Sequence, residues 1–398
     1  MKTIKFYTLG CKVNQYDTQS IRERFLRRGF KEILSSAKAG VCLINTCTVT
    51  QGADQKSRNI IRRSSRENPG AKIIVTGCLV NKDHAAIAAI KGVGLVIDKK
   101  FFPDGISGFS GRTRAFLKIQ DGCDNFCAYC KVPLVRGRSR SRSLCDVVGE
   151  ARALAKKGYK EIVLTGICLG AYGRDLRPKT NLVKLIGELE KIGGLLRIRL
   201  SSIEAGDVSG ELIEKLAGAP KLCRHLHIPI QSGDDLILKK MRRKYTRKYY
   251  LNLINLLRRK IPDIAITTDV IVGFPGEREK NFKNTLELVK RINPLKVHVF
   301  PYSSREGVLA CGCATELSTS VINKRKERLV RLADSLADGF RRRFLRRNMP
   351  VLFETRVKNK PGFWEGYSDN YIKVRIKSGR GLKNKLVPVI LLDKSLTL

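Results

Sequence analysis

Short apolar runs alternate with amphipathic stretches in the first hundred residues. The runs at 4–9, 41–44 and 73–75 are read as strands. The stretches at 17–28 and 54–66 carry apolar residues at helical spacing. Strands and helices that alternate in this way predict a parallel sheet with helices on both faces, so we expect a Rossmann-like α/β domain here.

The middle of the chain repeats this alternation. A glycine-rich stretch at 101–113 with few apolar residues separates it from the first part and predicts a linker. We expect six strands, at 115–119, 161–164, 196–200, 225–228, 264–272 and 296–300. We expect helices between them, at 146–157, 182–192, 211–217, 248–260 and 281–292. Six such units favour a partial (β/α)6 TIM-like barrel, with an active site at the carboxyl ends of its strands.

The last part of the chain has a different character. Residues 322–347 read as a helix with a dense basic face, which is either solvated or a contact for tRNA or rRNA. Apolar and polar residues then alternate at 351–357 and 371–376, which favours a small β-barrel. Trp364 and Tyr367 could stack on bases or pack in its core. Together the patterns predict an α/β protein with domains at 1–105, 109–345 and 346–398.

Charge narrows the class of partner. The chain of 398 residues has 78 Lys and Arg against 36 Asp and Glu, a net charge of +42. Such an excess attracts polyanions, so nucleic acid is the leading partner, and a lineage with arginine-rich proteins is the alternative. No run approaches the roughly 18 to 20 apolar residues of a membrane span, and residues 1–9 lack the apolar region of a signal peptide. We therefore expect a cytoplasmic protein whose 12 cysteines are ligands or buried thiols.

Three cysteines lie at C-x3-C-x2-C spacing directly after an apolar run at 116–119. These loop cysteines, Cys123, Cys127 and Cys130, can bind three irons of a [4Fe–4S] cluster and leave the fourth iron open for chemistry. A structural zinc site needs four ligands, and no nearby cysteine or histidine supplies the fourth. The spacing therefore favours a reactive cluster over zinc.

Three further cysteines each stand just past the end of a predicted strand. These strand-end cysteines are Cys11, Cys47 and Cys78. The carboxyl ends of strands are where open α/β sheets bind ligands, so three thiols at one sheet edge could meet in space. Each alone could be a small buried residue, but their repeated placement beside small neighbours such as Gly10 and Gly77 favours a second cluster with three ligands.

The segment from Gly122 to Cys130 resembles the cluster loop of the radical S-adenosylmethionine (SAM) enzymes. In that superfamily the open iron binds SAM and supplies the electron that cleaves it to a 5′-deoxyadenosyl radical. A tyrosine directly before the last cysteine is common there, so the resemblance places Tyr129 at the cofactor site.

Polar residues and glycines follow the strands of the predicted barrel. Glycines let backbone amides approach a ligand, and hydroxyls or carboxylates can hold ribose and methionine groups. Each could instead serve a turn, but their common location favours a SAM pocket. The candidates are Thr165, Gly166, Ser202, Glu204, Gln231, Ser232, Asp269 and Gly273.

Nearly the whole chain resembles the methylthiotransferases, which join an N-terminal cluster domain, a radical SAM domain and a C-terminal TRAM domain that binds RNA. The two sets of three cysteines carry this resemblance. Within the family, the chain is most similar to the bacterial branch that acts on threonylcarbamoyladenosine in tRNA. The stretches that favour this branch are 8–17, 45–50, 116–142, 162–173, 197–204, 225–245, 269–277 and 298–303.

The resemblance implies a reaction with two [4Fe–4S] clusters and two molecules of SAM. The loop cysteines would hold the cluster that cleaves SAM, and the strand-end cysteines an auxiliary cluster whose open iron carries sulfur. One SAM would methylate that sulfur, and the other would give the radical that takes hydrogen from carbon 2 of the adenine at tRNA position 37, next to the anticodon. That C–H bond is neither acidic nor electrophilic, so a cofactor must do the hard step.

The same resemblance implies the partners. They are the anticodon stem-loop of tRNA, an electron donor such as a flavodoxin or ferredoxin, and a sulfide or persulfide donor, with no membrane. Two alternatives stay open. One is methylthiolation of isopentenyl-adenosine in tRNA or of an aspartate in a ribosomal protein, and the other is a non-enzymatic RNA-binding protein with structural clusters. Arg243 and Tyr245 are the candidates for contact with the threonylcarbamoyl group.

The remaining cysteines and histidines have simpler interpretations. The chain departs from the family at 307–313, where the family usually has Gly-Thr-Pro-Ala and this sequence carries Cys311 and Cys313. Two extra thiols are favoured there over an adventitious metal site. Cys42, Cys145, Cys168 and Cys223 are expected to be core or structural thiols. Packing is favoured over metal ligation for His225, His227 and His298.

Overall fold

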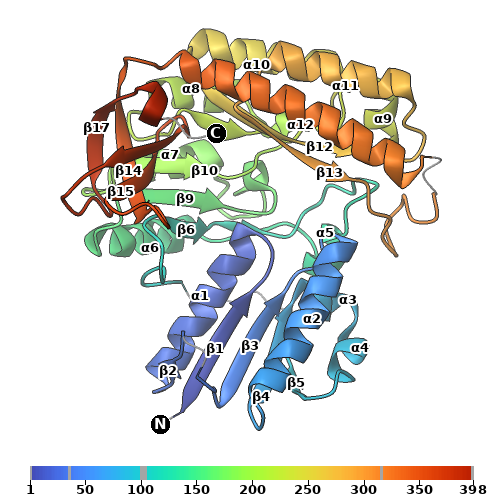
Figure 1. The fold of residues 1–398 in the computed structure, drawn as a ribbon, viewed down its shortest axis with the longest axis vertical. Coiled ribbons are helices and arrows are strands. Elements are labelled where there is room, and N and C mark those ends of the chain that lie inside the picture. The colour runs from blue at the N-terminus through green and yellow to red at the C-terminus, as the bar shows by residue number, and fades with distance from the viewer. Residues whose placement is uncertain (1, 35–36, 99–104, 314–316, 396–398) are drawn as a thin grey trace.

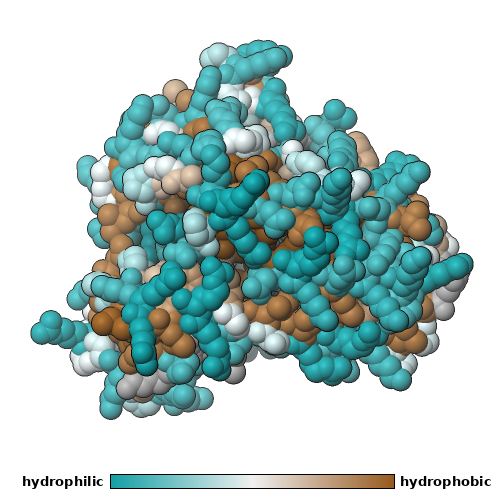
Figure 2. Space-filling model, turned by 90° about the horizontal axis from the view of Figure 1, so that it is seen from above, coloured by the Kyte–Doolittle hydropathy of each residue, from teal (hydrophilic) through white to brown (hydrophobic). Residues whose placement is uncertain are grey.

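The computed structural model describes residues 2–34, 37–98, 105–313 and 317–395. An N-terminal α/β layer (blue in Figure 1) lies beneath a larger α/β barrel (green to orange), and a small sheet (red) lies at one side of that barrel. Hydrophilic side chains predominate on the face in Figure 2, as expected from the charge of the chain. No helix in the described ranges is long and apolar enough to cross a membrane.

The N-terminal sheet has five parallel strands in the order β2-β1-β3-β4-β5. This is the order of a doubly wound α/β sheet, as predicted. The three longer strands were expected, whereas the short β2 and β5 at the sheet edges were not. The strands are β1 (Thr3–Thr8), β2 (Lys31–Glu32), β3 (Val41–Thr46), β4 (Lys72–Gly77) and β5 (Val93–Val96).

Helices cover both faces of this sheet because its side chains alternate in direction along each strand. Leu43 on β3 packs with Ile21 of one helix, whereas Ile44 packs with Ile61 of another helix on the opposite face. The first helix begins at Lys12, five residues earlier than expected, with Cys11 at its N-cap position. The helices are α1 (Lys12–Arg27), α2 (Gln51–Glu67), α3 (Cys78–Lys82) and α4 (His84–Ala88).

The central part is a partial barrel of six parallel strands. Two three-stranded sheets, β10-β9-β6 and β11-β12-β13, are joined by isolated bridges such as that between Ser202 and His227. Across the described ranges β6 and β13 do not pair, so the barrel stays open between them, as predicted. The strands are β6 (Ala115–Lys118), β9 (Glu161–Thr165), β10 (Arg197–Leu200), β11 (His225–His227), β12 (Ala265–Val272) and β13 (Lys296–Pro301).

Helices surround this barrel and follow its strands in turn (Figure 1). They are α6 (Leu144–Lys156), α7 (Leu182–Glu190), α8 (Gly210–Gly218), α10 (Arg247–Lys260), α11 (Glu279–Ile292) and α12 (Thr319–Arg342). Shorter elements are α5 (Val132–Arg136), α9 (Asp235–Lys240), the turns η1 (Leu169–Ala171) and η2 (Ala205–Asp207), and the paired strands β7 (Gln120–Asp121) and β8 (Arg140–Ser141).

The predicted helix 322–347 is wrong at its end. α12 stops at Arg342 because Phe340 and Phe344 turn into the core of the following sheet. That sheet is antiparallel and curled, in the order β16-β15-β14-β17, which is consistent with a small barrel. Its elements are β14 (Asn348–Arg356), β15 (Phe363–Ser368), β16 (Lys373–Lys377), β17 (Leu386–Ile390) and the turn η3 (Asp393–Ser395).

The aromatic residues of the C-terminal sheet face inward. Trp364 is 6% exposed and belongs to the sheet's core, which is the second of the two alternatives that the sequence left open for it. Tyr367 stacks on Tyr371, with ring centroids 5.0 Å apart. The domain boundaries stay a prediction, and part of the expected linker, 101–104, lies outside the described residues.

Candidate active site

A cavity of about 440 Å³ lies between the N-terminal sheet and the barrel. Residues that follow β1, β3 and β4 form one wall, and residues at the ends of β9, β10, β12 and β13 form the other. The carboxyl edges of both sheets therefore face one space. Apolar side chains such as Val13, Ile271 and Phe300 line it between the polar groups.

The three strand-end cysteines line this cavity together, as predicted. Cys47 and Cys78 come directly after β3 and β4, and Cys11 lies three residues past the end of β1. Cys11 is the N-cap residue of α1, and Cys78 is the first residue of α3. Burial, together with the neighbouring thiols of Cys78 and Cys11, raises the pKa of Cys47 to about 11. These thiols are close enough to act on one another, as three ligands of one cluster must be.

Two glycines permit this approach. Gly10 has φ +93°, and a Cβ there would lie 2.8 Å from Cys47 Sγ. Gly77 has φ +105°, and a Cβ there would lie 2.5 Å from backbone atoms of Thr46. Both positions exclude a side chain on two grounds, the left-handed backbone and the lack of space.

We expect Gly10→Ala to lower the iron content of the purified protein by about one cluster, because a methyl group at Cys47 Sγ displaces a ligand of that site. The measurement is iron and acid-labile sulfide per chain after anaerobic reconstitution. Gly29→Ala is the matched control, since Gly29 has φ +80° but no atom within 4 Å of its Cβ position. Equal losses in the two variants would show that backbone strain, not contact with Cys47, is responsible.

The loop cysteines follow β7, and Cys130 lines the same cavity. Cys123 and Cys127 lie half-buried. The backbone N–H of Asn125 donates to Cys123 Sγ at 3.3 Å, and Arg243 Nη1 donates to Cys127 Sγ at 3.3 Å. A hydrogen bond from Cys168 lowers the pKa of Cys123 to about 7, whereas burial raises that of Cys130 to about 12.

Each set of three cysteines has a buried arginine beside it. Arg136 Nη2 lies 4.0 Å from Cys11 Sγ and 2.5 Å from Asn14 Oδ1. Burial acts to lower the pKa of Arg136, but Asp121 and the strand-end cysteines raise it well above its ordinary value. Arg243 contacts Cys127, bonds Tyr129 Oη at 3.3 Å and forms an ion pair with Glu204.

The donor sets fit iron–sulfur clusters. Each offers three thiols, and hydrogen-bond donors and fixed positive charge lie beside them, which suits an anionic cluster of iron and sulfide with thiolate ligands. The loop cysteines would hold the cluster that binds SAM, and the strand-end cysteines would hold the second cluster. When bound, such a cluster supplies the electron that cleaves SAM.

Most of the predicted SAM-pocket residues meet at this cavity. Gln231 has φ +66°, an uncommon conformation for a residue with a side chain, and such strain clusters at functional sites. The predicted residues that line the cavity are Tyr129, Thr165, Gly166, Ser202, Glu204, Gln231 and Asp269.

Two predicted residues do not line the cavity. Ser232 is 1% exposed, and its hydroxyl lies 3.4 Å from Thr285 Oγ1 on α11, so it fixes a turn. Gly273 faces α12, where a Cβ would lie 2.8 Å from Ile322 Cγ1. Both follow strand ends, but their side-chain directions point away from the ligand space, which the sequence pattern did not reveal.

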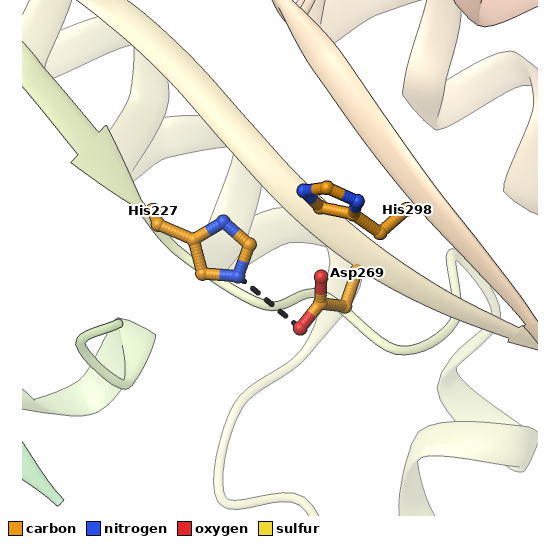
Figure 3. Close-up of side chains that lie close together, drawn as sticks. All are labelled: His227, Asp269 and His298. Atoms are coloured by element: carbon orange, nitrogen blue, oxygen red, sulfur yellow. Dashed lines mark ion pairs between the residues drawn. The ribbon is translucent and has the colours of Figure 1, made fainter. Parts of the chain in front are cut away.

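Inside the barrel, His227, Asp269 and His298 lie on adjacent strands and point toward one another (Figure 3). His227 Nε2 lies 3.1 Å from Asp269 Oδ2, and ligand atoms of the three lie within 4.8 Å of one another. This spacing could accept a metal ion, and packing over metal ligation stays a prediction for His227 and His298. His225 does pack, since it is buried and stacked on Tyr371 at 4.6 Å.

The remaining cysteines divide by exposure. Cys42, Cys168 and Cys223 are buried, as expected, although Cys168 lies beside the loop cysteine Cys123. Cys145 is exposed on α6, so its assignment to the core is wrong. Cys311 and Cys313 are exposed.

Sequence reasoning missed three residues at this site: Lys12, Asn14 and Arg136. Lys12 and Asn14 are close to Cys11 in the sequence, and Arg136 follows the loop cysteines. Their short distance along the chain from a cluster-ligand cysteine was the feature that could have identified them. Asn14 Nδ2 donates to the carbonyls of Leu9 and Thr46 at 2.7 and 2.9 Å and so joins the ends of two strands.

Comparisons with known proteins agree with this geometry. The Radical SAM superfamily matches residues 117–289, and the family described as Uncharacterized protein family UPF0004 matches residues 3–98. The chain is similar in fold to the radical S-adenosylmethionine methyltransferase TsrM from Kitasatospora setae, solved with cobalamin and a [4Fe-4S] cluster. That match has a TM-score of 0.54 at 14% identity, over 76% of this chain and 75% of the other.

Two curated relatives align over almost the full length. The threonylcarbamoyladenosine tRNA methylthiotransferase MtaB of Bacillus subtilis is 40% identical, over 98% of this chain and 94% of the relative. The tRNA-2-methylthio-N(6)-dimethylallyladenosine synthase of Clostridium tetani is 34% identical, over 96% of this chain and 92% of the relative. The strand-end cysteines and Cys130 line one cavity, and these relatives align with nearly the whole chain, so the chain belongs to the radical SAM tRNA methylthiotransferases.

Proposed function

We propose that this enzyme converts N6-threonylcarbamoyladenosine to 2-methylthio-N6-threonylcarbamoyladenosine at position 37 of tRNA. The observation that carries the proposal is one cavity lined by the three strand-end cysteines and by Cys130 of the loop, because radical formation and sulfur transfer must act on the same carbon. The name of the Bacillus subtilis relative supports the choice of nucleoside.

Residues of this chain have distinct roles in the proposal. The loop cysteines and the strand-end cysteines hold one cluster each. The part of the cavity that binds SAM and the substrate nucleoside is lined by Tyr129, Thr165, Gly166, Ser202, Glu204, Gln231 and Asp269. Arg136 and Arg243 place positive charge beside the two anionic clusters. The apolar wall keeps water away from a reactive intermediate.

Partners and location complete the proposal. The basic face of α12 and the curled C-terminal sheet, as a TRAM domain, bind the anticodon stem-loop through phosphate contacts. A flavodoxin or ferredoxin supplies the electron, a sulfide or persulfide supplies the sulfur, and the enzyme acts in the cytoplasm.

A second candidate is methylthiolation of dimethylallyladenosine in tRNA, and the Clostridium tetani relative favours it. The two nucleosides share the adenine carbon that reacts and differ in the group on N6. One group carries a carboxylate and the other is apolar, so the polarity of the cavity decides between them.

Expression in a bacterial strain that makes both modified adenosines but neither methylthio form tests the proposal. The host supplies electron and sulfur donors, so the assay does not depend on their identity. Nucleoside mass spectrometry of the tRNA is expected to show the methylthio form of threonylcarbamoyladenosine alone. The methylthio form of dimethylallyladenosine alone would establish the second candidate instead.

A further inference from the structure

Within the barrel, the cavity has a polar end that the two cluster sites do not require. Lys12 reaches it from the first turn of α1, and Asp269 reaches it from β12. His227 and His298 flank Asp269 on the neighbouring strands (Figure 3). Burial lowers the pKa of His298, and Lys12 is among the positive charges that lower it further. Lys12 and Asp269 line the same cavity.

Lys12 differs from the other cations that line the cavity. The guanidinium of Arg136 bonds Asp121 at 2.7 Å and Asn14. Lys131 lies on the other side, against Lys82 and Arg305. Lys12 has no hydrogen-bond or ion-pair partner among the residues that the structure describes. Lys12 is an exposed residue at the cavity, and its positive charge attracts a ligand that carries an anion.

The neighbouring groups fit the rest of such a ligand. Asp269 Oδ2 and His227 Nε2 lie 3.1 Å apart and pair with each other, so these two side chains need no metal ion between them. The second carboxylate oxygen of Asp269 and the imidazole of His298 remain for groups that donate or accept hydrogen bonds. A ligand with a carboxylate, N–H groups and a hydroxyl would match this end of the cavity.

We propose that Lys12 binds the carboxylate of the threonylcarbamoyl group, while Asp269 and His298 contact its ureido and hydroxyl groups. This inference rests on the proposed function and identifies a residue that selects the substrate. A dimethylallyl group carries no anion for the Lys12 ammonium, so that nucleoside would lack this charge-assisted contact.

The test compares two stem-loop RNAs that differ only in charge. One carries threonylcarbamoyladenosine, and the other carries the methyl ester of its threonine carboxylate. We expect the wild-type kcat/KM to favour the acid by at least about tenfold, as for a charge-assisted hydrogen bond. Lys12→Gln is expected to bring this ratio close to one, and Lys12→Arg to keep most of it. Partial loss of a cluster lowers both rates equally and leaves the ratio unchanged.

Lys131→Gln is the matched control, since Lys131 also lines the cavity and also stands next to a ligand cysteine. It should keep the wild-type ratio. An unchanged ratio in Lys12→Gln overturns the inference. Equal losses on acid and ester leave the ratio unchanged and therefore also overturn it. A wild-type enzyme that modifies neither RNA overturns the proposed function, and the inference with it.

Discussion

Replacing Cys47 by alanine will abolish methylthiolation but leave SAM cleavage, whereas replacing Cys127 will abolish both. Cys47 belongs to the wall formed by the N-terminal sheet, and Cys127 belongs to the loop at the barrel. Loss of one thiol from a set of three removes the site for that cluster alone. The measurement is 5′-deoxyadenosine and methylthio-nucleoside in the same anaerobic reaction.

Cys42→Ala is the control for this pair, because Cys42 is fully buried on β3 and faces α2 away from the cavity. It should retain both products. RNA binding should survive in all three variants, since neither cysteine set belongs to the basic surface. Methylthio-nucleoside formed by Cys47→Ala would contradict the assignment of the strand-end cysteines. Cleavage of SAM by Cys127→Ala would support the reading of the loop cluster as structural.

The second prediction with a large expected effect concerns the stability of the folded protein. Lys118 is 1% exposed and bonds Asp17 at 2.8 Å and Asp121 at 2.6 Å, which ties α1 to the barrel. Lys118→Met leaves these buried carboxylates without that charge. We therefore expect the free energy of unfolding to fall by about 3 to 5 kcal/mol. Urea titration followed by circular dichroism measures it.

Lys191→Met is the matched control for Lys118→Met. Lys191 also pairs with a carboxylate, Glu188 at 2.7 Å, but its side chain is 69% exposed. Removing the charge from such a surface ion pair should change the free energy of unfolding by less than about 0.5 kcal/mol. Similar losses in both variants would show that burial does not set the cost of removing Lys118.

The sequence predicted the parts of the site that depend on strand ends. A cysteine that follows each of three parallel strands must lie at one sheet edge, and the structure places Cys11, Cys47 and Cys78 at one cavity. The same argument placed Thr165 and Gln231 correctly. Main-chain periodicity determines these positions, so a single sequence is enough.

Side-chain direction and contacts between distant segments were not predictable in this way. Ser232 also follows a strand end but bonds Thr285 on α11, far along the chain. Arg136 lies within the stretch 116–142 that carries the family resemblance, but its contacts with Asn14 and Cys11 depend on how the two sheets dock. The end of α12 was misplaced because Phe344, at helical spacing from Phe340, serves the core of another sheet.

The most direct test of the account is one anaerobic reaction of the cluster-loaded enzyme with SAM, a reductant, sulfide and three stem-loop RNAs. The RNAs carry threonylcarbamoyladenosine, dimethylallyladenosine or unmodified adenosine at position 37. The account predicts a methylthio group only on the first RNA, together with 5′-deoxyadenosine. Release of 5′-deoxyadenosine with no methylthio group on any RNA would contradict it.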